Sequence, residues 1–169
     1  MAVLKSIPEE VLGHLYTMTG MIVTNWSFLE NALDHWTAIT FQDFRSSEIE
    51  SKMPRMLGEK IKFLSKCFRR IDGLAPFRED AMKVISRCEE LSDMRHYVVH
   101  GVLSGYDAED NATFVFRKID VAKDKKEHVL GEMRLPANHL ISAGTELINM
   151  AHFAQTISAH LIQASERER

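Results

Sequence analysis

A long apolar stripe near the start of the chain constrains the fold more than any other feature. Between about residues 7 and 44, large apolar side chains recur at steps of three or four residues, which places them on one face of an α-helix. The stripe consists of Leu15, Met18, Ile22, Trp26, Leu29, Leu33 and Trp36. Such a face is stable in water only when other helices cover it. The sequence therefore predicts a helical domain.

Three further helices are expected from the same periodicity and from the positions of proline and glycine. The four expected helices cover about residues 7–44, 54–72, 77–101 and 136–164. Ser6 followed by Glu9 forms a capping-box pattern that starts the first of them. Residues 165–169 are strongly polar, and we expect them to fray.

Between the third and fourth helices the hydrophobic period changes from that of a helix to that of a β-strand. The expected strands cover residues 102–106, 112–119 and 129–135. Short strands joined by polar turns form an antiparallel meander. The predicted fold class is therefore all-α: a four-helix up-down bundle with a small antiparallel β meander inserted at about residues 102–135, and residues 1–169 form one domain.

Composition limits the classes of function. A net charge of -3 argues against a protein that coats nucleic acids or membrane surfaces without specificity. The two cysteines, Cys67 and Cys88, fall within helical patterns and are expected to be buried and reduced. With no signal-peptide pattern and no apolar run of membrane-spanning length, the sequence predicts a soluble, cytoplasmic protein without membrane contact.

A cation interrupts the apolar line of the third helix. The apolar members of this line are Val84, Cys88, Leu91, Val98 and Val102. Arg95 occupies the position between Leu91 and Val98 where the spacing calls for another apolar residue. An unpaired guanidinium there would lower the stability of the fold by several kcal/mol. A carboxylate or a phosphate should therefore meet it. Glu30 is the first intramolecular candidate and Asp34 the second, and a purely structural ion pair remains an open alternative.

Four polar residues lie on one side of the third helix. Glu89, Asp93, His96 and His100 follow one another at steps of four, three and four residues. Two imidazoles beside Arg95 place proton carriers next to an anion binder, which is an arrangement suited to acid–base chemistry. An ordinary solvated helix face has the same pattern, so the sequence leaves both readings open.

Helix geometry separates the arginine from the second histidine. Arg95 and His100 would point about 140° apart and lie about 7.5 Å apart along an ideal helix. Two copies of the chain, meeting across a twofold axis, would bring such residues together, and we favour this arrangement. Phe41, Phe44 and Phe77 are expected to be exposed and to add apolar surface to the pairing of two copies.

A metal site is the main competing reading of the histidine pair. His96 and His100 have the spacing that places two ligands on one helix face, and Asp93 or Glu30 could add an oxygen. No third ligand has a spacing that fixes it, and no glutamate follows the first histidine as in zinc proteases. We therefore predict neither a metal nor another cofactor.

The spacing of Arg95 and His100, with four residues between them near the end of the third of four helices, resembles the motif of the HEPN superfamily. The segment from Trp26 to Glu30 is similar to the first helix of small bacterial members. The resemblance implies a homodimer with a composite cleft and, in active members, a metal-independent endoribonuclease. It also implies that His100 transfers protons, Arg95 stabilises charge on the phosphate, and His96 assists.

Two features depart from active relatives of this superfamily. Toxins regulated by a nucleotidyltransferase carry a tyrosine two residues after the histidine, where this chain has Val102. Basic residues near the third helix are also few, chiefly Arg78, Lys83 and Arg87. The alternative is therefore a catalytically inactive HEPN-like module that binds a nucleotide, RNA or a protein partner.

Overall fold

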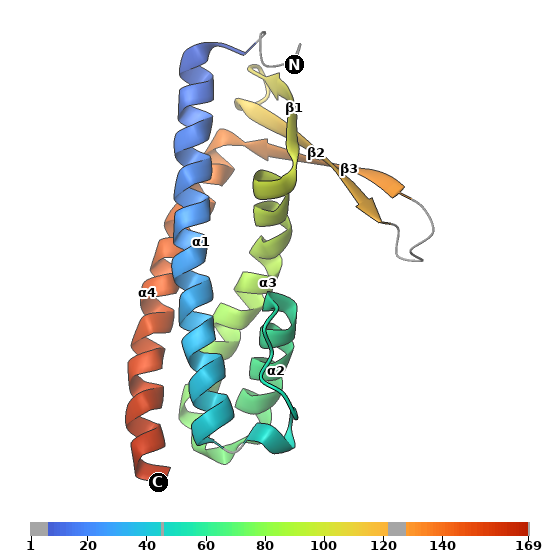
Figure 1. The fold of residues 1–169 in the computed structure, drawn as a ribbon. Coiled ribbons are helices and arrows are strands. Elements are labelled where there is room, and N and C mark those ends of the chain that lie inside the picture. The colour runs from blue at the N-terminus through green and yellow to red at the C-terminus, as the bar shows by residue number, and fades with distance from the viewer. Residues whose placement is uncertain (1–6, 45, 122–127, 169) are drawn as a thin grey trace. The chain divides into compact units, whose positions relative to one another are not determined.

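The chain has four α-helices, with a small antiparallel sheet between the third and the fourth, within the residues described by the computed structural model, which are 7–44, 46–121 and 128–168 (Figure 1). The helices are α1 (Glu9–Asp43), α2 (Leu57–Arg70), α3 (Arg78–His100) and α4 (Ala137–Glu168). The strands are β1 (Val102–Asp107), β2 (Thr113–Val121) and β3 (His128–Pro136). Short 3-10 turns cover Ser46–Glu48 and Asp72–Phe77. The predicted order of helices and strands is confirmed, while the expected cap at Ser6 lies outside the described residues.

The end of α4 differs from the prediction. Residues 165–168 are helical and not frayed, because the helix continues through Glu168. Leu161 is fully buried, and the Ser165 side chain is also buried, with its hydroxyl donating a 2.8 Å hydrogen bond to the backbone carbonyl of Ile162. Burial of Leu161 and Ser165 stabilises the end of the helix, where the polar sequence alone predicted fraying.

Residue contacts divide the chain into two compact units. The first unit comprises Met1–Thr24 and Leu91–Glu146, and the second comprises Asn25–Glu90 and Leu147–Arg169. Each unit therefore takes a segment of α1, of α3 and of α4, while the whole sheet belongs to the first unit and α2 to the second. The seven apolar residues of the α1 stripe are all buried, as predicted.

The second unit has an aromatic core at Trp36. Its indole ring meets the ring of Phe68 on α2 edge to face, with centroids 5.7 Å apart. Its Nε1 donates a 3.0 Å hydrogen bond to the backbone carbonyl of Ala154 on α4. The C-terminal part of α1 is thus packed against both α2 and α4. A large buried ring whose N–H group is also hydrogen-bonded fixes the relative positions of three helical segments at the point where they meet.

The first unit contains the sheet, in the order β1-β2-β3. One face carries the buried side chains Phe114, Phe116 and Leu135, as the alternation along β2 and β3 requires. On the opposite face, Thr113 and Val115 are also buried. The same face carries Val102, Ile119 and Leu130, whose residues are 70%, 71% and 62% exposed. Ile119 pairs directly with Leu130 in the register of β2 and β3. The sheet therefore has a buried apolar face and an apolar patch that faces solvent.

The exposure of Val102 corrects the apolar line predicted for α3. The helix ends at His100, and at Gly101 a side chain would collide with the backbone carbonyl oxygen of Tyr97. Glycine is therefore required where the chain turns from α3 into β1. Since Val102 follows this turn, strand geometry and not helical periodicity sets its direction. The helical members Val84, Cys88, Leu91 and Val98 are buried as predicted.

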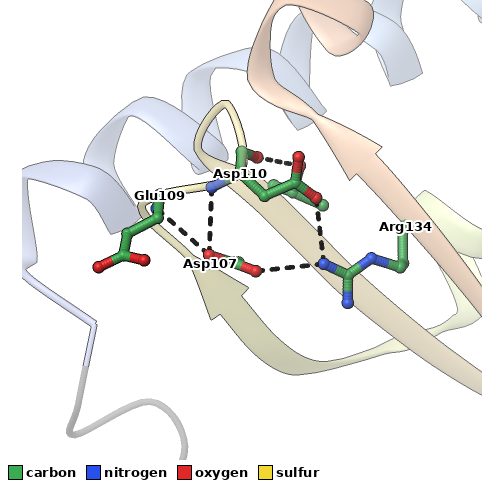
Figure 2. A network of polar contacts seen from close by, with 5 residues as sticks. Asp107, Glu109, Asp110 and Arg134 are labelled. Atoms are coloured by element: carbon green, nitrogen blue, oxygen red, sulfur yellow. Dashed lines mark hydrogen bonds and ion pairs between the residues drawn. The ribbon is translucent and has the colours of Figure 1, made fainter.

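The turn between β1 and β2 is held by a polar network (Figure 2). The Oδ1 atom of Asp107 accepts 3.2 Å hydrogen bonds from the backbone N–H groups of Glu109 and Asp110. Arg134 reaches across from β3, and its Nη2 lies 3.3 Å from Asp107 Oδ2 and 3.2 Å from Asp110 Oδ2. One arginine thus ties the turn to the far strand of the sheet.

The three aromatic residues expected on the surface are not exposed. Phe44 is buried, and Phe41 and Phe77 are half-buried. The ring of Phe41 lies 6.1 Å from that of Phe63, and the ring of Phe77 stacks on His160 at 6.4 Å. The prediction of exposure was wrong because Phe44 is part of the core, while Phe63 of α2 and His160 of α4 supply ring contacts to Phe41 and Phe77.

Candidate functional site

A pocket of about 510 Å³ in the first unit gathers residues from the end of α3 and from the sheet. It is lined by His96, His100, Val102, Arg117, Lys118, Ile119 and Leu130. The helix supplies two imidazoles, β2 supplies two cations, and all three strands supply apolar walls. We call this the histidine pocket.

The two histidines of the pocket are in mutual contact. Their ring centroids lie 4.8 Å apart, with an angle of 61° between the ring planes, and both residues are exposed. One helical turn separates them, so the last turn of α3 sets this geometry. Neighbouring solvent-accessible imidazoles can accept and donate protons on the same bound molecule.

The two cations of the pocket differ in their surroundings. Arg117 binds Glu132 on β3, with its Nε and Nη2 each 2.8 Å from Oε2, so that carboxylate offsets its charge. Lys118 lies over the aromatic face of Tyr97, with Nζ 4.9 Å from the ring centroid. This cation–π contact orients the ammonium group beside the last turn of α3. An anionic ligand in the pocket would therefore meet an oriented lysine and an arginine that is already paired.

The residues predicted for the site are divided between the two units. Asp93, Arg95, His96 and His100 belong to the first unit. Asp93 is exposed like the two histidines, whereas Arg95 is half-buried. Glu30 and Asp34 belong to the second unit, so an ion pair between either of them and Arg95 stays a prediction.

Within the second unit, Asp34 and Glu30 have other neighbours. Asp34 forms an ion pair with Lys60 of α2, a lysine that is only 8% exposed. Burial raises the pKa of the Cys88 thiol to about 12, and the negative charge of Glu30 adds to this shift. Glu30 is thus close enough to α3 for its charge to act on a side chain of that helix.

Sequence reasoning missed three charged residues. Arg117 and Lys118 line the histidine pocket, and Lys60 is the partner of Asp34. Their charge alone indicates that the side chains of Arg117 and Lys118 reach solvent. The sequence alone does not predict that these two side chains lie near the end of α3. Lys60 occupies a polar position in a helical pattern, and no local feature of the sequence predicts that it is buried.

Neither thiol has the features of a reactive cysteine. Cys67 and Cys88 are both free and buried, as predicted. Burial raises the pKa of Cys67 to about 11, although a hydrogen bond with the Ser46 side chain opposes the shift. Among residues 7–44, 46–121 and 128–168, no group of three histidine, cysteine, aspartate or glutamate side chains could hold a metal ion.

Comparisons with known proteins assign no family to the chain. No protein-family model, no curated protein and no solved structure matches it. The described parts of the chain also contain no helix with the length and apolar character needed to cross a membrane.

Proposed function

We propose that the chain is a HEPN-like four-helix bundle that cleaves RNA without a metal ion, through two histidine pockets paired in a cytoplasmic homodimer. The observation that carries the proposal is the contact between the exposed imidazoles of His96 and His100 in a pocket that also contains Arg117 and Lys118. Phosphodiester cleavage requires proton transfer at two oxygens and stabilisation of negative charge, and these residue types supply both.

In the proposed reaction, the ribose 2′-oxygen attacks the neighbouring phosphorus atom as the bond from phosphorus to the 5′-oxygen breaks. His100 takes the proton from the 2′-hydroxyl, or else gives a proton to the leaving 5′-oxygen, and His96 assists in the complementary role. The products are a 2′,3′-cyclic phosphate and a 5′-hydroxyl, so atoms and charge balance without a further reactant. DNA lacks the attacking hydroxyl and would not be cleaved.

The cations have a separate role in this proposal. Lys118 and Arg95 would stabilise the negative charge that develops on the phosphate. Arg95 would act at the cleft between two copies, while Asp93 would orient the cations or contact the ribose. The net charge of -3 is compatible with a local RNA contact because a few oriented cations suffice there.

A second candidate is a catalytically inactive module that binds a protein, a nucleotide or RNA. It is favoured by the exposed apolar side chains Val102, Ile119 and Leu130 at the histidine pocket and by the Glu132 carboxylate that already offsets Arg117. Exposed apolar residues gathered around a pocket are typical of a protein interface. Loss of catalysis would leave the same surface in place.

The test is an RNA cleavage assay with the full chain in the presence of EDTA. The substrates are a fluorescently labelled mixed-sequence RNA and DNA of the same sequence. His100→Ala should reduce the cleavage rate at least about 100-fold, because a general acid or base contributes about that much or more. Since His100 is exposed, the thermal transition should stay nearly unchanged. His152→Ala is the matched control, since His152 is an exposed histidine of α4 that does not line the histidine pocket.

The outcomes separate the two candidates. Cleavage of RNA and not DNA, with a cyclic phosphate product that disappears in His100→Ala, supports the ribonuclease. The absence of cleavage by the wild-type chain, or equal rates in wild type and His100→Ala, overturns it. Sedimentation analysis of the same samples checks the homodimer, and a monomer at all concentrations would contradict the paired site.

A further inference from the structure

A second recess lies in the second unit, at the start of α2. This groove, of about 1040 Å³, is formed by one residue of α1, by the segment that precedes α2 and by the first turns of α2. It is lined by Phe41, Glu50, Ser51, Lys52, Met53, Pro54, Arg55, Met56, Glu59, Lys62, Phe63 and Lys66. We call it the α2 groove. It has no residue in common with the histidine pocket, so ligand binding in the groove does not depend on RNA cleavage.

The lining of the α2 groove includes adaptable apolar side chains. Met53 and Met56 are 45% and 69% exposed, although both are large apolar residues. Between α1 and α2, the half-buried ring of Phe41 lies 6.1 Å from the ring of Phe63, which is buried. Methionines fit their flexible thioether chains around varied apolar groups and are frequent at peptide-binding surfaces. The groove is therefore suited to receive an aliphatic side chain.

The charges around the α2 groove are unbalanced. Four cations line it, Lys52, Arg55, Lys62 and Lys66, against the two carboxylates of Glu50 and Glu59. All four cations are exposed and none belongs to the core. The surplus charge surrounds an apolar recess, so the groove favours a ligand that is both anionic and apolar.

Both carboxylates of the groove are already engaged. Glu50 lies 3.9 Å from the ammonium of Lys66. Glu59 Oε2 accepts hydrogen bonds from the backbone N–H groups of Arg55 at 3.4 Å and Met56 at 3.3 Å, at the start of α2. In the part of the chain that the structure describes, no carboxylate pairs with the side chains of Lys52, Arg55 or Lys62. These three side chains are available to an outside anion.

We propose that the α2 groove binds an acidic peptide segment of a partner protein that carries an aliphatic anchor residue. The anchor enters beside Met53, Met56 and Phe41, and carboxylates on either side of it meet Lys52, Arg55 and Lys62. Single-stranded RNA fits less well, because its bases stack on exposed aromatic faces, whereas Phe63 is 1% exposed and Phe41 is half-buried. Complementary charge and an apolar anchor together define the class of ligand.

The test measures binding to the full chain by fluorescence anisotropy. The probe is a fluorescein-labelled peptide in which two adjacent leucines are flanked on both sides by glutamates and aspartates. Matched probes replace the leucines with serines, replace the acids with lysines, or substitute an oligouridine RNA of similar length. We expect saturable binding of the acidic leucine peptide with a dissociation constant on the order of 10–100 µM, weakened by added salt. Each of the other three probes should bind at least about tenfold more weakly.

Variants of the chain locate the binding site. Lys62→Glu and Arg55→Glu should each weaken peptide binding at least about tenfold, because each reverses a charge beside the anchor. Arg69→Glu is the matched control, since it reverses an exposed charge on α2 outside the groove and should leave binding unchanged. Thermal unfolding of all variants checks that they fold.

Four results would overturn the proposal. The first is failure of the wild-type chain to bind the acidic leucine peptide, and the second is tighter binding of RNA than of that peptide. The third is equal peptide affinity in wild type and Lys62→Glu when both are folded. The fourth is equal binding of the serine and leucine peptides, because charge alone would then carry the interaction without an aliphatic anchor.

Discussion

Trp36 and Ala154 lie 118 residues apart in the sequence and are joined by a 3.0 Å hydrogen bond from the indole N–H to the backbone carbonyl. Trp36 is fully buried, so its ring and its polar atom both belong to the core of the second unit. The Ala154 carbonyl also accepts a hydrogen bond of 3.1 Å from the Ser158 hydroxyl. Removal of the indole would therefore leave the Ala154 carbonyl hydrogen-bonded to Ser158, but it would remove the packing contacts of the ring.

Trp36→Phe should lower the free energy of unfolding by about 2–4 kcal/mol, because it removes a buried hydrogen bond and leaves a small cavity. Urea unfolding followed by circular dichroism measures the change. Tyr16→Phe is the control, since Tyr16 is exposed and its variant should stay within about 0.5 kcal/mol of wild type. Equal stability of the two variants would show that Trp36 does not join α1 to α4.

The ion pair between Asp34 and Lys60 predicts an asymmetric mutational response. Asp34→Ala leaves a nearly buried ammonium without its partner and should cost about 1–3 kcal/mol of unfolding free energy. Lys60→Met keeps the packing of the aliphatic stem and leaves a carboxylate that water can reach, so its effect should be within about 1 kcal/mol. A double-mutant cycle in urea measures the coupling, and additive effects would exclude a stabilising pair.

The turn between β1 and β2 contains a strained residue. Ala112 has a φ of 51°, a conformation that costs a residue with a Cβ atom about 1 kcal/mol or more. Ala112→Gly should therefore raise the free energy of unfolding by about 0.5–1 kcal/mol. Ala108→Gly is the control in the same connection, since Ala108 does not have a positive φ, and it should lower stability by a similar amount. A destabilised Ala112→Gly variant would contradict this assignment of strain.

The buried thiols predict a loss of stability at high pH. Burial raises the pKa of Cys67 to about 11 and that of Cys88 to about 12, above their ordinary value of 9.0. The folded chain thus retains protons that the unfolded chain releases above pH 9, and the unfolding free energy falls as the pH rises toward those values. The double variant Cys67→Ala, Cys88→Ala should show a shallower decline between pH 9 and 11 in urea titrations.

The same burial predicts slow alkylation. At pH 8 the native chain should react with iodoacetamide at least about 100-fold more slowly than the urea-unfolded chain, since few thiolates form and the sulfur atoms are covered. Mass spectrometry of quenched samples measures both rates. Rapid labelling of either cysteine in the native chain would show that its part of the core opens readily.

The order of helices and strands was predictable because it depends on local properties of the chain. The stripe of α1 and the change of period after Gly101 reflect which side chains can share a face, and the structure confirms both. Val102 is a residue for which local spacing gave a wrong prediction. Its spacing continued the helical line of α3, but the steric limit at Gly101 turns the chain, and Val102 lies exposed on a strand.

The candidate site was predictable only in part. His96 and His100 share one helix face, so their proximity followed from a spacing of four residues. Arg117 and Lys118 reach the same pocket from β2, and this depends on how the sheet returns to the end of α3. The pairing of Asp34 with Lys60 likewise depends on how α1 meets α2.

By itself, the sequence determined which segments become helices and strands and that the apolar stripe of α1 is buried, because periodicity acts between close neighbours along the chain. Only the tertiary structure decided which charged groups meet, including the cations at the histidine pocket and the surplus of cations at the α2 groove. Such contacts join residues from separate elements. Their distances depend on packing and strand register, and a local pattern contains no information about either.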